Sequence, residues 1–265
     1  MGTAALATRL ATPRTKPVRD RTTCGLAFDD LGGPLVAVCG LTGGAGSTTV
    51  ALALARQSAL ESRVPVLIAE HGNLCGGLAA AAGQASPLGL AALSGHLDAS
   101  QPLPGAFVEL APGLRLIAAT PTRHQASAAG ALDTLLAQAR DAHGLVVIDC
   151  GIGWDRDDPV LRRATHVLWT MPATATGLAR AQMLFASDAV PPAGVTPEAL
   201  AAVGHRRDGS VRIRALRRLA RERCERIVLI AHDRLHTLAS TELNDAWLRA
   251  CTGLAPFLAR RRDAR

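Results

Sequence analysis

A glycine-rich run, GLTGGAGSTT at residues 40–49, stands between a short apolar segment and a stretch rich in Ala and Leu. Glycines let successive backbone N–H groups converge on one point, and the start of a following helix adds partial positive charge there. This arrangement favours the binding of phosphate groups, and the Thr48 hydroxyl stands where it could bind Mg²⁺. The residues expected to form this cofactor-binding loop are Gly43, Gly44, Ala45, Gly46, Ser47, Thr48 and Thr49.

Two acidic residues, Glu70 and Asp149, directly follow apolar runs further along the chain. Ligands of parallel sheets bind at the carboxyl ends of the strands, so both carboxylates are expected near the loop. We predict catalytic roles for Glu70 and Asp149, with Asp149 joining Thr48 at a metal ion. The alternative is that both are strand-end acids satisfied by backbone N–H groups, and that the loop is a relic in which Ser47 only caps a helix.

Short apolar runs alternate with helical patterns along the rest of the chain, which predicts an α/β fold with a mostly parallel sheet covered by helices on both faces. The predicted strands cover residues 35–39, 64–69, 107–110, 114–117, 145–149, 166–170, 200–203 and 227–230, with the third and fourth forming either a hairpin or two short strands around Pro112-Gly113. The predicted helices cover residues 48–59, 88–97, 126–142, 177–186, 211–224 and 244–261.

The glycine-rich run resembles the deviant Walker A motif of the ParA/MinD ATPases, K-G-G-x-G-K-T-T, and the resemblance implies a P-loop ATPase fold over residues 34 to about 260. Both motif lysines are replaced, the signature lysine by Thr42 and the P-loop lysine by Ser47. The only lysine in the chain is Lys16, far from the loop. Arg123 and Arg206 are the arginines considered as substitutes.

Three further segments resemble the same family. Residues 66–73 are similar to its second strand and D-x-D segment, where Glu70 keeps one carboxylate and Gly72 has lost the other. Residues 147–151 resemble the Walker B strand, with Asp149 intact, and residues 169–172 resemble the strand that follows. The asparagine expected near an adenine is Gly204 here. The resemblance therefore implies a degenerate member whose ATP hydrolysis is weak or absent.

The composition suits one globular domain, since hydrophobic residues make up 48% of the 265 residues and the formal net charge is +7. We expect a disordered basic tail at 1–33 and a single domain at 34–265. The six cysteines form no C-x-x-C pair, which favours reduced, buried thiols in a cytoplasmic protein. Neither a membrane-spanning pattern nor a secretory signal is expected.

Nine arginines fall between residues 206 and 226. Arg214, Arg217, Arg218 and Arg221 are spaced to form one basic stripe on a helix whose apolar face is Ile213, Leu216, Ala220 and Cys224. The stripe is either a solvated face or a site for DNA phosphates or anionic lipid. The last predicted helix, by contrast, places Trp247, Leu248, Cys251, Leu254 and Leu258 on one face, which we expect to pack in the core.

These observations favour a degenerate ParA/MinD-like protein that acts in positioning or recruitment, and proteins of the TadZ/CpaE type, associated with pilus and secretion machines, look similar. The expected cofactors are ATP and Mg²⁺. Expected partners are a protein of a larger assembly, duplex DNA or an anionic membrane, and a second copy of the chain, with a location at the nucleoid or membrane periphery. The alternatives are a DNA partition or conjugation ATPase and a scaffold that has abandoned nucleotides.

Overall fold

The computed structural model describes residues 32–61, 64–71, 77–98, 107–118, 129–194, 196–205, 211–221, 223–231 and 252–258. The strands are β1 (Leu35–Gly40), β2 (Val66–Glu70), β3 (Val108–Ala111), β4 (Leu114–Ile117), β5 (Leu145–Gly151), β6 (His166–Pro172), β7 (Glu198–His205) and β8 (Arg226–Ala231). The helices are α1 (Ser47–Glu61), α2 (Gly77–Ala82), α3 (Leu90–Asp98), α4 (Ala129–Ala142), α5 (Pro159–Arg163), α6 (Ala175–Phe185), α7 (Ile213–Arg221) and α9 (Ala255–Leu258).

The strands form one sheet in the order β3-β4-β2-β5-β1-β6-β7-β8. Every pairing in it is parallel except that of β3 with β4. β1 and β2 are buried along their whole length, and apart from Glu70 at the end of β2 they carry no polar side chain, as expected of strands covered on both faces. The predicted sheet and the predicted hairpin are therefore both confirmed, and Gly113 takes the positive φ of 78° that its turn requires.

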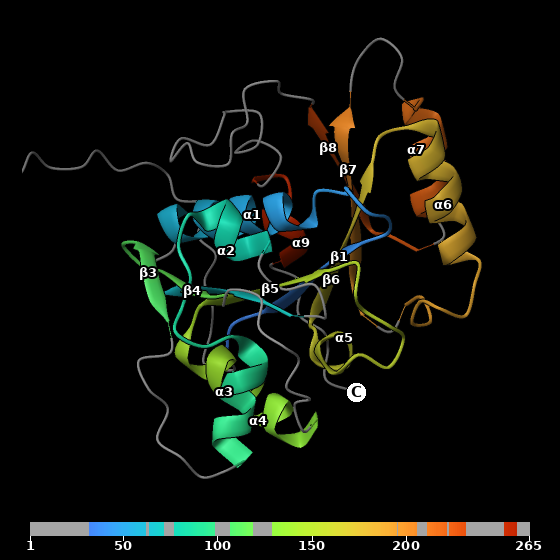
Figure 1. Cartoon of the computed structure of the whole chain (residues 1–265). Coiled ribbons are helices and arrows are strands. Elements are labelled where there is room, and N and C mark those ends of the chain that lie inside the picture. Colours follow the sequence, from blue (N-terminus) through green and yellow to red (C-terminus); the bar gives the residue numbers. More distant parts are fainter. Residues whose placement is uncertain are drawn as a thin grey trace, which may run out of the picture.

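Helices cover both faces of the sheet (Figure 1). One layer of the core joins α1, α2 and α9 to alternate residues of the strands, and the other joins α3, α4, α5, α6 and α7 to the remaining strand residues. Small side chains let α1 lie close to the sheet, since Ala51, Ala53 and Ala55 are fully buried. The thiols of Cys39 and Cys150 are also buried, as expected.

Several predicted elements need correction. Helix α7 ends at Arg221, so Cys224 is not part of it, and Ile213 is 41% exposed instead of facing the core. The helix expected over 244–261 is not continuous, because Gly253 and Leu254 form a turn before α9. Leu254 and Leu258 do pack in the core, whereas Trp247, Leu248 and Cys251 lie outside the described residues.

Two short helices, α2 and α5, were not predicted, because five or six residues show too little periodicity. Asp158 caps α5 by accepting a hydrogen bond from the Val160 N–H (2.8 Å), and Pro159 occupies its first turn. Residues 1–31 of the expected tail lie outside the described residues. The first described backbone contact is the Gly33 N–H donating to the Arg140 carbonyl at 2.9 Å.

Candidate functional site

The glycine-rich loop leaves the sheet at the carboxyl end of β1 and turns into α1 (Figure 1). Gly44 and Gly46 have φ values of 70° and 81°, which only glycine adopts without strain. A Cβ on Gly46 would also lie 3.1 Å from Val203 Cγ1, so a larger residue there would require the Val203 side chain to shift by a few tenths of an ångström. The backbone thus takes a tight turn with left-handed residues, which is the geometry expected of a phosphate loop.

Ser47 does not cap α1, contrary to one alternative from the sequence. The helix begins at Ser47 itself, and the carbonyl of Gly46 accepts the first helical hydrogen bond, from the Val50 N–H at 2.9 Å. Instead, the Ser47 and Thr48 hydroxyls lie close enough to the Asp149 carboxylate to favour its ionised form and so lower its pKa. The replacement for the P-loop lysine therefore lies beside the acid at the end of β5.

The two predicted acids lie side by side. Glu70 and Asp149 are register partners on the parallel strands β2 and β5, and their side chains are 7% and 2% exposed. Glu70 accepts a hydrogen bond from the Leu78 N–H at 3.1 Å, and Asp149 accepts one from the Gly151 N–H at 3.1 Å. Both acids thus have the backbone donors that the structural alternative foresaw.

Burial raises the pKa of Asp149, and the nearby Glu70 carboxylate raises it further. The Thr48 hydroxyl and the Gly151 N–H oppose this shift without cancelling it. A buried acid whose pKa is raised next to a second acid is the situation that a bound cation relieves, because the cation favours the ionised form.

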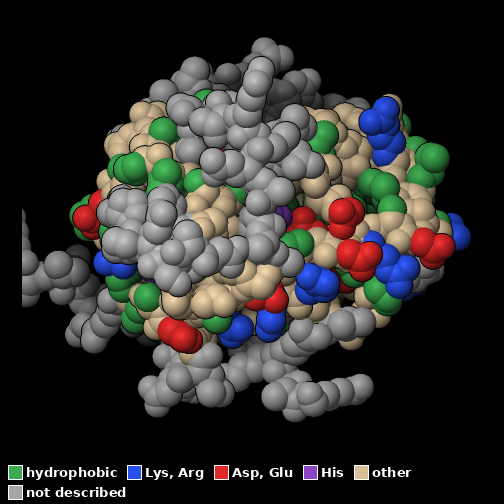
Figure 2. All heavy atoms as spheres, turned by 60° about the horizontal axis from the view of Figure 1, so that its bottom comes forward, with side chains coloured by type: hydrophobic (Ala, Val, Ile, Leu, Met, Phe, Trp, Pro, Cys, Tyr) green, Lys and Arg blue, Asp and Glu red, His purple; other side chains and the backbone are tan. Residues whose placement is uncertain are grey.

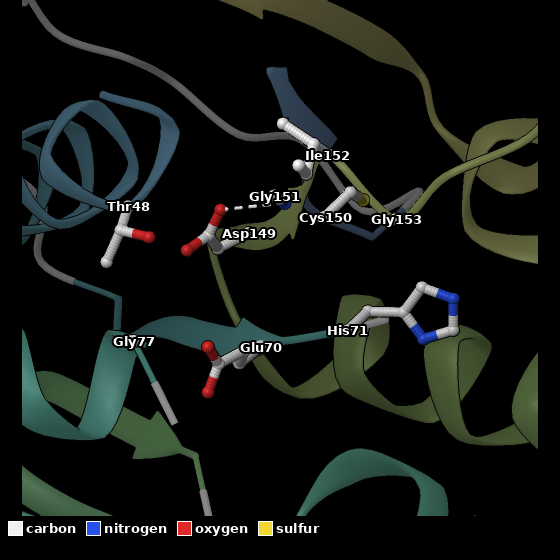
Figure 3. A pocket seen from close by; sticks show the side chains of 9 residues that line it. All are labelled: Thr48, Glu70, His71, Gly77, Asp149, Cys150, Gly151, Ile152 and Gly153. Atoms are coloured by element: carbon white, nitrogen blue, oxygen red, sulfur yellow. Dashed lines mark hydrogen bonds between the residues drawn. The ribbon is translucent and has the colours of Figure 1, made fainter. Parts of the chain in front are cut away.

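A small cavity of about 60 Å³ lies between these groups. In Figure 3 the Thr48 hydroxyl points toward Asp149, the Glu70 carboxylate lies beside them, and the His71 ring points away. His71 instead contacts Asp158, with 3.2 Å between Nε2 and Oδ2. A hydroxyl and two carboxylates therefore line the cavity.

The oxygen chemistry of the cavity fits Mg²⁺ better than a transition metal. Within the described ranges, no group of three His, Cys, Asp or Glu side chains could hold a metal ion by itself. Mg²⁺ needs no such group, because it takes one or two protein oxygens and completes its shell with water and ligand phosphates. Thr48 and Asp149 are the residues that would hold it, as predicted from the sequence.

Neither position of the missing lysines supplies a charge. The Thr42 side chain is nearly buried, and its hydroxyl donates to the Gly43 carbonyl at 3.3 Å. The substitutes named from the sequence, Arg123 and Arg206, lie outside the described residues.

Sequence reasoning missed the segment that follows Asp149. The Trp154 ring nitrogen donates to the carbonyl of Gly40 at 3.0 Å, and the Trp154 and Trp169 rings meet edge to face at 5.0 Å. Trp154 therefore ties the start of the loop to the segment after β5. The sequence signal that could have indicated it is the position of Trp154 five residues after Asp149, between glycines and charged residues.

The four arginines of the predicted stripe are exposed on α7, as expected, while Leu216 and Ala220 are buried beneath them. In the described part of the chain they line neither of the cavities beside the loop. On the face turned forward in Figure 2, basic and acidic side chains are mixed. The stripe is thus separate from the loop site.

Comparison with known proteins identifies the fold. No protein-family model matches the chain, and no curated protein matches it either. Among solved structures, a ParA family ATPase from Chlorobium tepidum TLS has a TM-score of 0.61 at 16% identity, covering 84% of this chain and 91% of that one. A variant of McdA from Cyanothece, solved as its ATP complex, has a TM-score of 0.60 at 16% identity, covering 89% of this chain and 100% of that one.

The septum site-determining protein MinD with Mg-ADP, from Pyrococcus horikoshii OT3, has a TM-score of 0.58 at 13% identity and covers 84% of this chain and 94% of that one. At such low identities these likenesses concern the fold. The chain has the fold of the ParA/MinD P-loop ATPases, as the resemblance of its loop implied. No described helix is long and apolar enough to cross a lipid bilayer.

Proposed function

We propose that this protein binds a Mg²⁺-nucleotide at the glycine-rich loop and uses it in a positioning or recruitment role, with little or no hydrolysis. The observation that carries the proposal is the placement of Thr48, Glu70 and Asp149 around one cavity next to the loop. Two proteins of the same fold were solved with ATP or Mg-ADP, which supports a nucleotide as the ligand.

Slow hydrolysis follows from the charges around the loop. Phosphoryl transfer depends mostly on positioning and on stabilising negative charge, and a P-loop lysine supplies such charge on the phosphate oxygens. Thr42 and Ser47 are neutral, and the buried acids Glu70 and Asp149 add negative charge instead. A site of this kind can hold a nucleotide with a metal ion while it stabilises the transition state poorly.

The role that fits such a protein is recruitment controlled by nucleotide occupancy. The TadZ/CpaE-like resemblance points to a pilus or secretion machine as the assembly, with a second copy of the chain as a further partner. We place the protein in the cytoplasm, at the periphery of membrane or nucleoid, and we propose that residues 34–265 form its one domain behind a basic tail at 1–33.

A second candidate function is the binding of duplex DNA in partition or conjugation, with anionic membrane as the rival surface. The observation that favours it is the exposure of Arg214, Arg217, Arg218 and Arg221 on α7. Such a stripe would contact phosphates and would not read base edges.

The test of the main proposal is thermal unfolding with ADP or the non-hydrolysable analogue AMPPNP, each with and without Mg²⁺. A ligand at 100 times its Kd stabilises a protein by about 2.7 kcal/mol, so a clear rise in Tm is expected with Mg²⁺ present. Thr48→Ala should remove the Mg²⁺-dependent part of the rise. A parent protein whose Tm does not respond to any nucleotide would favour the scaffold alternative.

A further inference from the structure

A second and larger cavity, of about 590 Å³, lies beside the glycine-rich loop. It is lined by the loop residues Thr42 and Gly43, by Ile152, Trp154 and Arg156 from the segment after β5, and by Arg180 of α6. It is the larger of the two cavities described beside the loop, and Thr48, Glu70 and Asp149 are not among the residues that line it.

The two cavities adjoin at Ile152, which lines both. Ile152 is 47% exposed although it is a large apolar residue, and its Cγ2 would lie 2.9 Å from a Cβ on Gly40. Ile152 therefore lies at the boundary between the cavity with the buried acids and the cavity with the arginines. A ligand that fills the first and extends past Ile152 reaches the second.

Only the larger of these two cavities is lined by arginines. The smaller one contains the carboxylates of Glu70 and Asp149, while Arg156 and Arg180 line the larger one. Both arginines are exposed, and within the described residues neither has a carboxylate within ion-pair distance. Asp155 and Asp157 also line this cavity, but the Asp155 carboxylate is engaged with its own segment, accepting from the Asp157 N–H at 2.9 Å.

A nucleoside triphosphate at the loop would bring more negative charge than one divalent cation can balance, since two carboxylates already surround the metal position. The loop offers backbone N–H groups and the neutral side chains of Thr42 and Ser47. Guanidinium groups bind phosphate oxygens through paired N–H donors and stay charged at all working pH values. The free arginines next to the loop are thus the groups able to supply the missing positive charge.

We propose that Arg156 and Arg180 bind the terminal phosphate of a nucleoside triphosphate from the side of the larger cavity, taking over the charge that lysines supply in other phosphate loops. This inference rests on the proposed binding of a nucleotide at the loop. The bond from Trp154 to the Gly40 carbonyl fixes the segment that carries Arg156 against the loop. Because the arginines contact only the terminal phosphate in this arrangement, they distinguish triphosphate from diphosphate, and they make the recruitment role depend on which nucleotide is bound.

The test compares Mg-AMPPNP and Mg-ADP by isothermal titration on the parent and on the Arg156→Gln/Arg180→Gln double variant. Both arginines are exposed, so the variant should fold, and an unchanged thermal transition without nucleotide verifies this. The matched control is Arg226→Gln, an exposed arginine at the opposite, amino end of β8. Hydrogen bonds to charged groups contribute enough that we expect about a ten- to hundredfold loss of AMPPNP affinity in the double variant. ADP affinity should stay within about twofold of the parent, as should both affinities of the control.

The outcomes separate this inference from the proposed function. If the parent binds both nucleotides and the double variant keeps the parent's ratio of AMPPNP to ADP affinity, the arginine assignment is wrong while nucleotide binding stands. An equal loss for both nucleotides also overturns the assignment, because it shows a general charge effect. If the parent binds neither nucleotide, the proposed function fails and the inference fails with it.

Discussion

Glu70 and Asp149 are register partners at the ends of two adjacent parallel strands, and both carboxylates are buried. Two buried acids in this position destabilise a protein unless a cation or a proton compensates them. We interpret the pair as part of a metal-binding site that lowers the stability of the protein when no ligand is bound.

Asp149→Asn should stabilise the protein without ligand at neutral pH and should remove its response to Mg²⁺-nucleotide. Burial raises the pKa of Asp149, so the folded state retains the proton to higher pH than the unfolded chain does. The parent therefore loses stability relative to the variant as pH rises above the pKa of the unfolded state. Urea unfolding at several pH values should show an advantage of the variant that grows from acidic to neutral pH. A variant less stable than the parent at pH 7 would mean that the carboxylate is structural.

Ser47→Lys should increase nucleotide affinity and phosphate release. The lysine would begin at the position whose hydroxyl now lies beside Asp149, and would add a cation beside two buried acids. Because single groups that stabilise transition-state charge contribute about 10²–10³ in rate, we expect an increase of at least about tenfold over a slow parent. The control is Thr134→Lys, an exposed position on α4. Parent turnover already equal to that of an intact ParA/MinD ATPase would contradict the slow-hydrolysis proposal.

Arg223→Met should destabilise the fold by about 3–5 kcal/mol, because it leaves a buried charge without its partner. Arg223 donates to both carboxylate oxygens of Glu198, whose pKa burial raises, and it lies 5.4 Å from the Trp169 ring. The bond that Trp169 donates to Glu198 stabilises the same carboxylate. Urea unfolding measures the loss, and Glu198→Gln combined with Arg223→Met should recover part of it. A single variant within about 1 kcal/mol of the parent would show that the pair is not coupled.

Replacing Arg214, Arg217, Arg218 and Arg221 with Gln tests the stripe on α7. If the stripe binds duplex DNA, the parent's affinity should fall with salt at a log–log slope of about −3 to −4, one unit for each phosphate contact, and should not depend on sequence. The variant should lose this binding with an unchanged circular dichroism spectrum, because glutamine maintains the helix and the buried Leu216 and Ala220 are untouched. A parent that binds anionic vesicles but not DNA would indicate the membrane instead. Binding to neither at low salt would mean that the stripe is a solvated face.

The fold was predictable because its signals are strong and local. Continuous apolar runs such as 35–39 predicted buried parallel strands, and the loop's glycines predicted its turn. The place of Asp149 at the loop's edge of the sheet also followed, since the loop and Asp149 both stand at carboxyl ends of parallel strands, but its register partnership with Glu70 did not, because it depends on the strand order. The ends of α7 did not follow, because Ile213 and Cys224 continue its apolar spacing although the helix stops at Arg221.

The roles of Trp154, Arg156 and Arg180 could not be predicted from the sequence, because each depends on how distant parts of the chain fold around the loop. Arg180 lies on α6, and only the fold brings it to the same cavity as Thr42. The position of Ser47 beside Asp149 was hidden for a similar reason, since a serine before a helix suggests a cap until the helix boundary is known.

The central claim is that the loop of this fold still binds a Mg²⁺-nucleotide without lysines. The most direct measurement is a crystal structure of the protein grown with millimolar AMPPNP and Mg²⁺. We predict that the phosphates contact the backbone N–H groups of residues 43–48, that the Thr48 hydroxyl and the Asp149 side of the cavity face the metal ion, and that density for the terminal phosphate extends toward Arg156 and Arg180. A structure in which this loop is empty under those conditions, or in which the nucleotide binds elsewhere, would contradict the claim.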